Sequence, residues 1–306
     1  MPTTDPDLTY APMRPGDHNG ARSRRRWGCL TAAVAAVAAV ALMAALVWGG
    51  VVFVRDGLPA IFGAQRCQAT ALGTSVDLSP EQMHHAATIT TIALARGLPA
   101  RAASIALATA IQESKLRNIT YGDRDSLGLF QQRPSMGWGT RDQVLDPVHA
   151  TNAFYDALVK IRGWETGNIN DVAQAVQRSG HPEAYADHEL QGRTLASALA
   201  GYSPEGLGCR LSAPSEAGSA AHVATALKDT GIASGVSSST GAVRTAAMSE
   251  QRAWAVGAWA VAQAESRGIT AVQVGDRRWE RARGRSGWTW KPAQGQAGVV
   301  VITLAR

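Results

Sequence analysis

The stretch AIQESKLRNITYGDRDSLGLFQQRP, residues 110–134, carries the most information about the fold. Apolar side chains at helical spacing, among them Leu107 and Ile111, predict a helix over residues 100–116. A Gly-rich loop follows, in which residues 127–131 predict a short strand. This part of the chain therefore predicts a helix, a polar loop and a small strand.

Helix start and stop signals surround this segment. Ser79-Pro80-Glu81-Gln82 has the pattern of an N-cap, a proline at the first helical position and a capping-box glutamine. Further helices are predicted at residues 80–97, at 146–161, from 170 or 171 onward, and at 182–201. Residues 67–210 are thus expected to form an α+β, mostly helical domain rather than a parallel-sheet enzyme.

Glu113 stands at the C-terminal end of the predicted 100–116 helix. A carboxylate there meets the negative end of the helix dipole and apolar neighbours such as Ile111, and both favour its protonated form. A carboxylic acid that keeps its proton near neutral pH can protonate a glycosidic oxygen. The alternative, which composition alone favours, is an exposed Glu113 paired with Lys115 or Arg117.

Three motifs, in order, resemble the core of lysozyme-fold enzymes that cut peptidoglycan glycan strands, the lytic transglycosylases and goose-type lysozymes. They are Glu113-Ser114, Gly122-Asp123-Arg124 and Gly128-Leu129-Phe130-Gln131. The resemblance covers about residues 80–200 and implies a lysozyme-like domain. It implies Glu113 as general acid and Asp123 as second carboxylate. It also implies a sugar groove lined by Gln131 and the backbone around Phe130, with Ser114 and Gly128 in the substrate site.

The chain departs from the pattern of these families at two places. Arg133 stands where goose-type enzymes have a further Asp, and Ala175-Val176-Gln177 stands where the families have Ala-Tyr-Asn. Gln177 stays a candidate substrate contact, and Tyr185, from a nearby turn, is the candidate for the missing hydroxyl. A hydrolase and a transglycosylase, in which Glu113 alone forms a 1,6-anhydro end, both stay open. So does a non-catalytic peptidoglycan-binding or cell-wall assembly module.

Residues 27–54 contain no charged side chain. This apolar run exceeds the roughly 20 residues that span a bilayer and the roughly 7–15 of a cleaved signal peptide, so it predicts one transmembrane helix. Four arginines at 22–26 precede it, which places the disordered tail 1–26 in the cytoplasm and the main domain outside the cell membrane. Cys67 and Cys209 then lie in an oxidising compartment and are expected to form a disulfide that closes the domain.

Two further segments follow the predicted domain. Residues 211–244 are rich in Ser, Gly, Ala and Thr and predict a flexible linker, with a possible helical turn at 221–228. Residues 245–306 predict a small α/β C-terminal module with a helix at 253–266 and strands at 269–274 and 298–304. Its basic loop at 277–285 is a candidate site for anionic wall polymer, or else a solvated surface loop.

Charge and composition exclude several functions. Residues 67–211 carry 12 basic and 14 acidic side chains, a net charge of −2, which argues against a nucleic-acid partner. Three cysteines without a CxxC pair, and no HExxH motif, predict neither a metal site nor a cofactor. Four histidines, His84, His85, His181 and His188, are expected to be ordinary polar positions. Trp138 and Trp164 are candidates either for stacking on sugars or for the core.

Overall fold

The computed structural model describes residues 43–45, 48, 64–178 and 183–306. Residues 1–64 and 65–306 form two separate units. The predicted tail 1–26 lies outside the described residues, and so does nearly all of the predicted transmembrane segment 27–54. In the described parts of the chain, no helix is both long and apolar enough to cross a membrane. The chain is α+β, as predicted, with about 45% helix and 17% strand.

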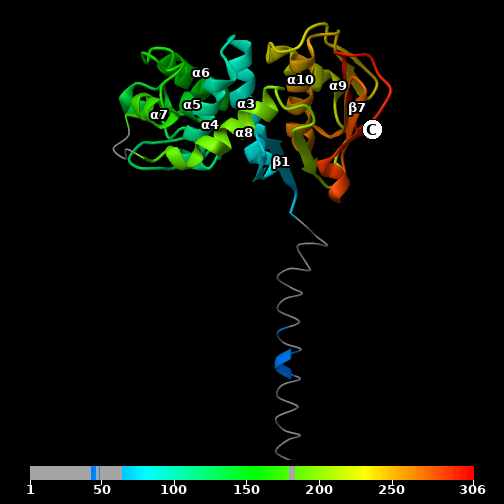
Figure 1. The fold of residues 1–306 in the computed structure, drawn as a ribbon, viewed down its shortest axis with the longest axis horizontal. Coiled ribbons are helices and arrows are strands. Elements are labelled where there is room, and N and C mark those ends of the chain that lie inside the picture. Colours follow the sequence, from blue (N-terminus) through cyan, green and yellow to red (C-terminus); the bar gives the residue numbers. More distant parts are fainter. Residues whose placement is uncertain (1–42, 46–47, 49–63, 179–182) are drawn as a thin grey trace, which may run out of the picture. The chain divides into compact units, whose positions relative to one another are not determined.

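Two of the helices that precede residue 200 begin where their local capping signals place them. Ser79 and Gln82 form the predicted capping box of α3 (Pro80–Ala95), and Asp146 caps α6 (Pro147–Leu158). The other helices of this region are α4 (Ala100–Ser114), α5 (Arg141–Leu145), α7 (Ile169–Gln177) and α8 (Glu189–Leu199). Figure 1 shows them gathered together, and α4 packs against α3, α6, α7 and α8. The helix α4 is therefore the central element that carries Glu113.

A small antiparallel sheet, which the sequence did not indicate, joins the two ends of this helical region. It consists of β1 (Arg66–Ala71), β2 (Thr74–Leu78) and β3 (Leu207–Arg210) in the order β2-β1-β3. Cys67 pairs with Cys209 across β1 and β3, and the two form the predicted disulfide. The strand pairing and the disulfide thus hold together residues that are 142 positions apart in sequence.

The C-terminal part contains a six-stranded antiparallel sheet in the order β4-β5-β9-β6-β7-β8. Its strands are β4 (Ser237–Ser239), β5 (Ala242–Arg244), β6 (Ile269–Val274), β7 (Arg277–Glu280), β8 (Trp290–Pro292) and β9 (Val300–Leu304). The helices are α9 (Ala220–Asp229), α10 (Glu250–Ala262) and α11 (Ala264–Arg267). Residues 253–262 of α10 are all buried, since this helix packs against β6 and also against α3 and α8.

Four predictions about this architecture need correction. The predicted linker 211–244 contains α9, which confirms the helical turn predicted at 221–228, and the hairpin β4–β5, which was not predicted. Its apolar residues Val223, Leu227 and Val243 are buried in the common core. The basic loop 277–285 begins as β7, because its residues pair with β6. Residues 127–131 form a turn closed by one bridge from Leu127 instead of a strand. The last helix before residue 200 begins at Glu189, after the short 3-10 turn Ala186–His188.

The two predicted extracytoplasmic domains pack as parts of one unit, residues 65–306. The indole nitrogen Nε1 of Trp290 donates a hydrogen bond to the carbonyl oxygen of Leu207, at 2.8 Å. Arg277 forms an ion pair with Glu205, at 2.6 Å. Because buried helix α10 contributes to the core on both sides, residues 212–306 complete the hydrophobic core of the helical region.

Two adjacent histidines lie where α3 meets α10 and α11. His84 Nδ1 is 2.7 Å from Oε1 of Gln263, and the buried Nδ1 of His85 has no hydrogen-bond partner among the described residues. Burial lowers the pKa of His84, and burial together with the His84 charge lowers the pKa of His85 to about 4. The folded chain therefore binds fewer protons here than the unfolded chain.

Because the folded chain binds fewer protons at these histidines than the unfolded chain does, we expect the folded state to lose stability at low pH. A depressed histidine pKa gives stability that is present above the unfolded value of 6.5 and is lost as the pH falls toward 4. We expect the free energy of unfolding to fall by about 2 kcal/mol between pH 7 and pH 5 on account of His85. Urea titrations at both pH values should show a smaller loss in His85→Leu than in the exposed control His222→Gln. Equal losses in both variants would contradict this assignment.

Candidate functional site

Glu113 lies in the last turn of α4, where its side chain is half-buried. The hydroxyl of Tyr185 donates a hydrogen bond to Oε1 of Glu113, at 2.6 Å. Tyr185 itself is fully buried, and its backbone N–H donates to Oδ1 of Asn170 in α7, at 3.1 Å. The structure therefore brings Tyr185 to Glu113, although 72 positions separate them in sequence.

The segment that follows α4 is fastened to the helices around it. Ser114 Oγ donates to the carbonyl oxygen of Leu129 at 2.7 Å, and Gln177 Nε2 donates to that of Phe130 at 2.8 Å. The buried ring of Phe130 stacks on Phe154 of α6, with 4.7 Å between the ring centroids. These contacts fix the Gly-Leu-Phe-Gln turn against α4, α6 and α7.

Four residues predicted for the substrate site do not line the cleft beside Glu113: Ser114, Gly128, Phe130 and Tyr185. Ser114 and Phe130 are buried. Gly128 has a φ of +75°, and a Cβ at this position would run into the backbone carbonyl oxygen of Val144. Residues 114, 128 and 130 therefore preserve the shape of the turn, whereas Gln131 and Gln177 line the cleft.

A cleft of about 780 Å³ lies beside Glu113. Its walls come from the end of α4, the loop 123–138, the C-terminal half of α6 and the end of α7. Trp138 lines it and is half-buried, whereas Trp164 is only 6% exposed and belongs to the core. A cleft of this size, lined by the carboxyl groups of Glu113, Asp123 and Asp156, by amide side chains and by an indole, can hold a carbohydrate chain.

The second predicted carboxylate, Asp123, lines this cleft from an exposed loop. Its side chain is 92% exposed, and its charged neighbour is Arg124, at 3.9 Å. Asp125 is different, because it accepts hydrogen bonds from Arg133 Nε at 2.8 Å and from the N–H and Oγ of Ser135. These donors hold the pKa of Asp125 well below its usual range. Arg133 thus pairs with an acidic residue that precedes it in the sequence.

Left-handed backbone conformations gather around the cleft. Gln131 and Arg178, which line it, have φ angles of 47° and 52°, and Arg124 has 56°. At the end of α4, Lys115 and Leu116 have φ angles of 54° and 58°. Residues other than Gly adopt this region at an energetic cost, and such strain is common at functional sites.

Sequence reasoning missed two basic residues of the cleft. Lys160 follows α6, and Arg178 is the C-cap of α7. Both lie just beyond the C-terminal end of a helix, where the helix dipole favours a cation, so a basic residue there does not by itself indicate a functional site. Nothing in the linear pattern indicates that the two positions face one cleft.

The other candidates do not join Glu113. His84 and His85 lie at the α3–α10 contact, and His188 Nε2 is 2.9 Å from Oε1 of Gln112. His181 is outside the described residues. In the described ranges 64–178 and 183–306, no group of His, Cys, Asp or Glu side chains has an arrangement that could hold a metal ion.

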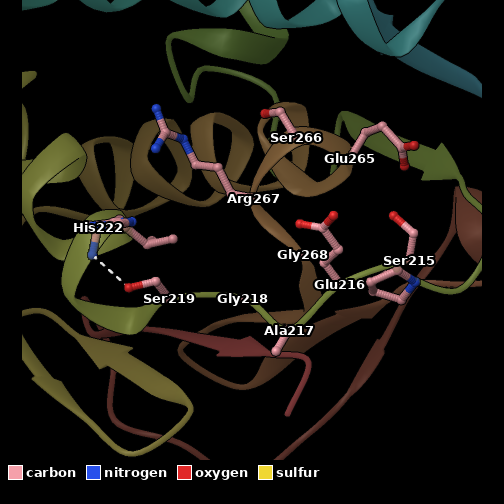
Figure 2. Close-up of a pocket in the computed structure, with 12 residues that line it drawn as sticks. Ser215, Glu216, Ala217, Gly218, Ser219, His222, Glu265, Ser266, Arg267 and Gly268 are labelled. Carbon is pink, nitrogen blue, oxygen red and sulfur yellow. Dashed lines mark hydrogen bonds between the residues drawn. The ribbon is translucent and has the colours of Figure 1, made fainter.

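A second hollow of about 250 Å³ lies in the C-terminal part, between the start of α9 and the end of α11 (Figure 2). Its walls include Glu216, His222, Glu265 and Arg267. Glu265 is paired with Arg281 at 2.6 Å, and the N–H of His222 donates to Oγ of Ser219, the N-cap of α9. None of the residues that the sequence predicts for function lines this hollow.

No protein-family model matches the chain, and no curated protein matches it. What the site can do therefore follows from its own residues. A half-buried carboxyl group, hydrogen-bonded to a buried tyrosine beside a large polar cleft, is suited to proton transfer to a bound substrate.

Proposed function

We propose that this chain cleaves the glycan strands of peptidoglycan, with Glu113 as general acid on a lysozyme-like fold. The observation that carries the proposal is the hydrogen bond from Tyr185 to Oε1 of Glu113 at the wall of the cleft. The motif resemblance of residues 110–134 supports a carbohydrate substrate, and the position of Glu113 beside the cleft supports proton transfer to its glycosidic oxygen.

Glu113 is proposed to transfer the proton, and Tyr185 to orient and stabilise the Glu113 carboxyl group. In the protonated acid, the Tyr185 hydroxyl donates to Oε1, so the acidic proton resides on Oε2. Transfer of that proton to the glycosidic oxygen leaves a carboxylate, which the same hydroxyl stabilises as a hydrogen-bond donor to the charged form. The Glu113 carboxylate can then remove a proton from the attacking hydroxyl group.

The attacking group is proposed to be a hydroxyl of the sugar itself. Of the other carboxylates that line the described cleft, Asp123 is 92% exposed and Asp156 is paired with Arg96 at 2.6 Å. Neither is held in place to activate a water molecule, which favours the mechanism with Glu113 alone and a 1,6-anhydro product. Trp138 is proposed to stack on a sugar face, while the amides of Gln131 and Gln177 bind sugar substituents.

The proposed site of action is the cell wall. The uncharged run 27–54, preceded by arginines, is proposed to anchor the chain in the cell membrane with its C-terminal part outside. We do not extend the proposal to anionic wall polymer at residues 277–285. Arg277, Arg278 and Arg281 each form an ion pair with a glutamate, so three of the five arginines in that segment are neutralised.

A second candidate function is a peptidoglycan-binding module without catalysis. Val176 in the cleft wall, where the families have an aromatic hydroxyl, favours this alternative. Incubating full-length protein in detergent with purified peptidoglycan distinguishes the two functions. Release of fragments with 1,6-anhydro ends, identified by mass spectrometry, is expected, whereas binding without release would establish the alternative.

The tyrosine gives a separate test of the mechanism. Tyr185→Phe removes the hydrogen bond to Glu113, and we expect the rate of glycan cleavage to fall by roughly 10- to 100-fold, the usual value of a hydrogen bond to a charged group. Tyr155→Phe is the matched control, because its buried hydroxyl donates to the carbonyl oxygen of Ile89 at 2.9 Å and does not contact Glu113. Rates are compared after both variants are shown to have similar melting temperatures. An equal loss in the two variants would assign Tyr185 a purely structural role.

A further inference from the structure

The charges that line the cleft are not all neutralised. Six charged side chains of the described residues line it: Glu113, Asp123, Arg133, Asp156, Lys160 and Arg178. Arg133 is paired with Asp125, Asp156 with Arg96, and Asp123 lies near Arg124. In the part of the chain that the structure describes, Lys160 and Arg178 form no ion pair, and both are exposed.

The backbone does not account for an arginine at position 178. Arg178 has a left-handed conformation with a φ of 52°, and its N–H closes α7 by donating to the carbonyl oxygen of Gln174 at 2.7 Å. Glycine or asparagine meets this requirement at a lower energetic cost. Arg178 therefore lines the cleft from a backbone position that favours other residues.

We propose that Lys160 and Arg178 bind carboxylate groups that the glycan strand carries, so that the cleft selects an acidic glycan over a neutral one. This inference rests on the proposed function. A peptidoglycan strand offers carboxylates from two sources, the lactyl ether on alternate sugars after the peptides are removed, and the stem peptides where they remain. A chain of N-acetylglucosamine offers neither.

Two unpaired cations beside a bound polyanion give a modest and salt-sensitive preference. Exposed ion pairs contribute little individually, so each cation is expected to change affinity by at most about 5-fold, and the two together by at most about 25-fold. Salt above physiological concentration should reduce this preference, since the Debye length falls to about 3 Å at 1 M.

Binding is measured in the Glu113→Gln background, so that no ligand is cut. The ligands are strands with stem peptides, the same strands after an amidase has removed the peptides, and N-acetylglucosamine oligomers of equal length. The variants are Lys160→Gln and Arg178→Asn, the second of which suits the left-handed backbone. Arg162→Gln controls for the first as an exposed cation outside the cleft lining. Lys115→Asn controls for the second, because it is a left-handed C-cap cation outside that lining.

The expected result is tighter binding of both acidic strands than of the neutral oligomer, and loss of this difference in the two cleft variants but not in the controls. If only one of the two acidic strands binds more tightly than the neutral oligomer, that strand identifies which carboxylate is bound. Equal binding of acidic and neutral glycans, by a protein whose parent cleaves peptidoglycan, overturns the inference alone. If none of the three ligands binds and the parent releases nothing, the proposed function is wrong and the inference is wrong with it.

Discussion

Glu113→Gln is expected to lower the rate of glycan-strand cleavage by a factor on the order of 10²–10⁴, the usual contribution of general acid catalysis. The amide has nearly the shape of the carboxylic acid, and its oxygen can still accept the hydrogen bond from Tyr185. The amide has no acidic proton to give to the glycosidic oxygen. The fold should therefore persist while the chemistry is lost.

The comparison must separate catalysis from stability, because a substitution at a helix end can act on the fold alone. Glu165→Gln is a suitable control, since this exposed glutamate lies outside the cleft lining. Rates of fragment release from purified peptidoglycan are compared between proteins of matched melting temperature. If Glu113→Gln digests the glycan as fast as its parent, the assignment of the proton donor is wrong.

Asp123→Asn belongs to the same series. A carboxylate that is 92% exposed on a loop can position substrate, but the structure gives it no contact that would hold it as an obligatory base. We expect this variant to slow cleavage much less than Glu113→Gln does. An equal loss would mean that Asp123 activates the attacking group, and reducing ends in place of 1,6-anhydro ends should then appear.

Gly201→Ala is expected to destabilise the protein by about 3–5 kcal/mol, the largest stability effect predicted here. Gly201 follows α8 with a φ of +81°, and a Cβ there would lie 2.7 Å from the backbone nitrogen of Ala255 in α10. It would also run into the carbonyl oxygen of Gln251. Both contacts are with backbone atoms of a buried helix, which cannot move aside without opening the core between α8 and α10.

Gly97→Ala is the matched control for this substitution. Gly97 has a φ of +70°, and a Cβ at this position would meet no atom within 4 Å. It therefore carries the cost of the left-handed conformation, about 1–2 kcal/mol, without the collision. Urea unfolding of both variants measures the difference. Equal losses would mean that residues 65–211 and 245–306 do not pack closely at α10.

The sequence alone determined those elements whose signals are local. The capping box of Ser79 and Gln82 marks the start of α3, Asp146 marks that of α6, and the strand-forming residues 269–274 give the bounds of β6. The position of Glu113 at the end of α4 follows from helical spacing in the same way. Each of these signals lies within one or two turns of the residue that it places, so it can be read without knowing the fold.

Tertiary structure decided every feature that depends on a distant partner. In the Ser- and Gly-rich segment 211–244 the sequence predicted only a helical turn, and the hairpin β4–β5 formed there because β9 was available to pair with β5. Ser114 and Phe130 proved to fasten the motif turn, and Tyr185 reached Glu113 across 72 positions. Lys160 and Arg178 came to line one cleft from the ends of two helices. Side-chain contacts of this kind depend on how helices and strands pack against each other. The spacing of residues along the chain does not predict that packing.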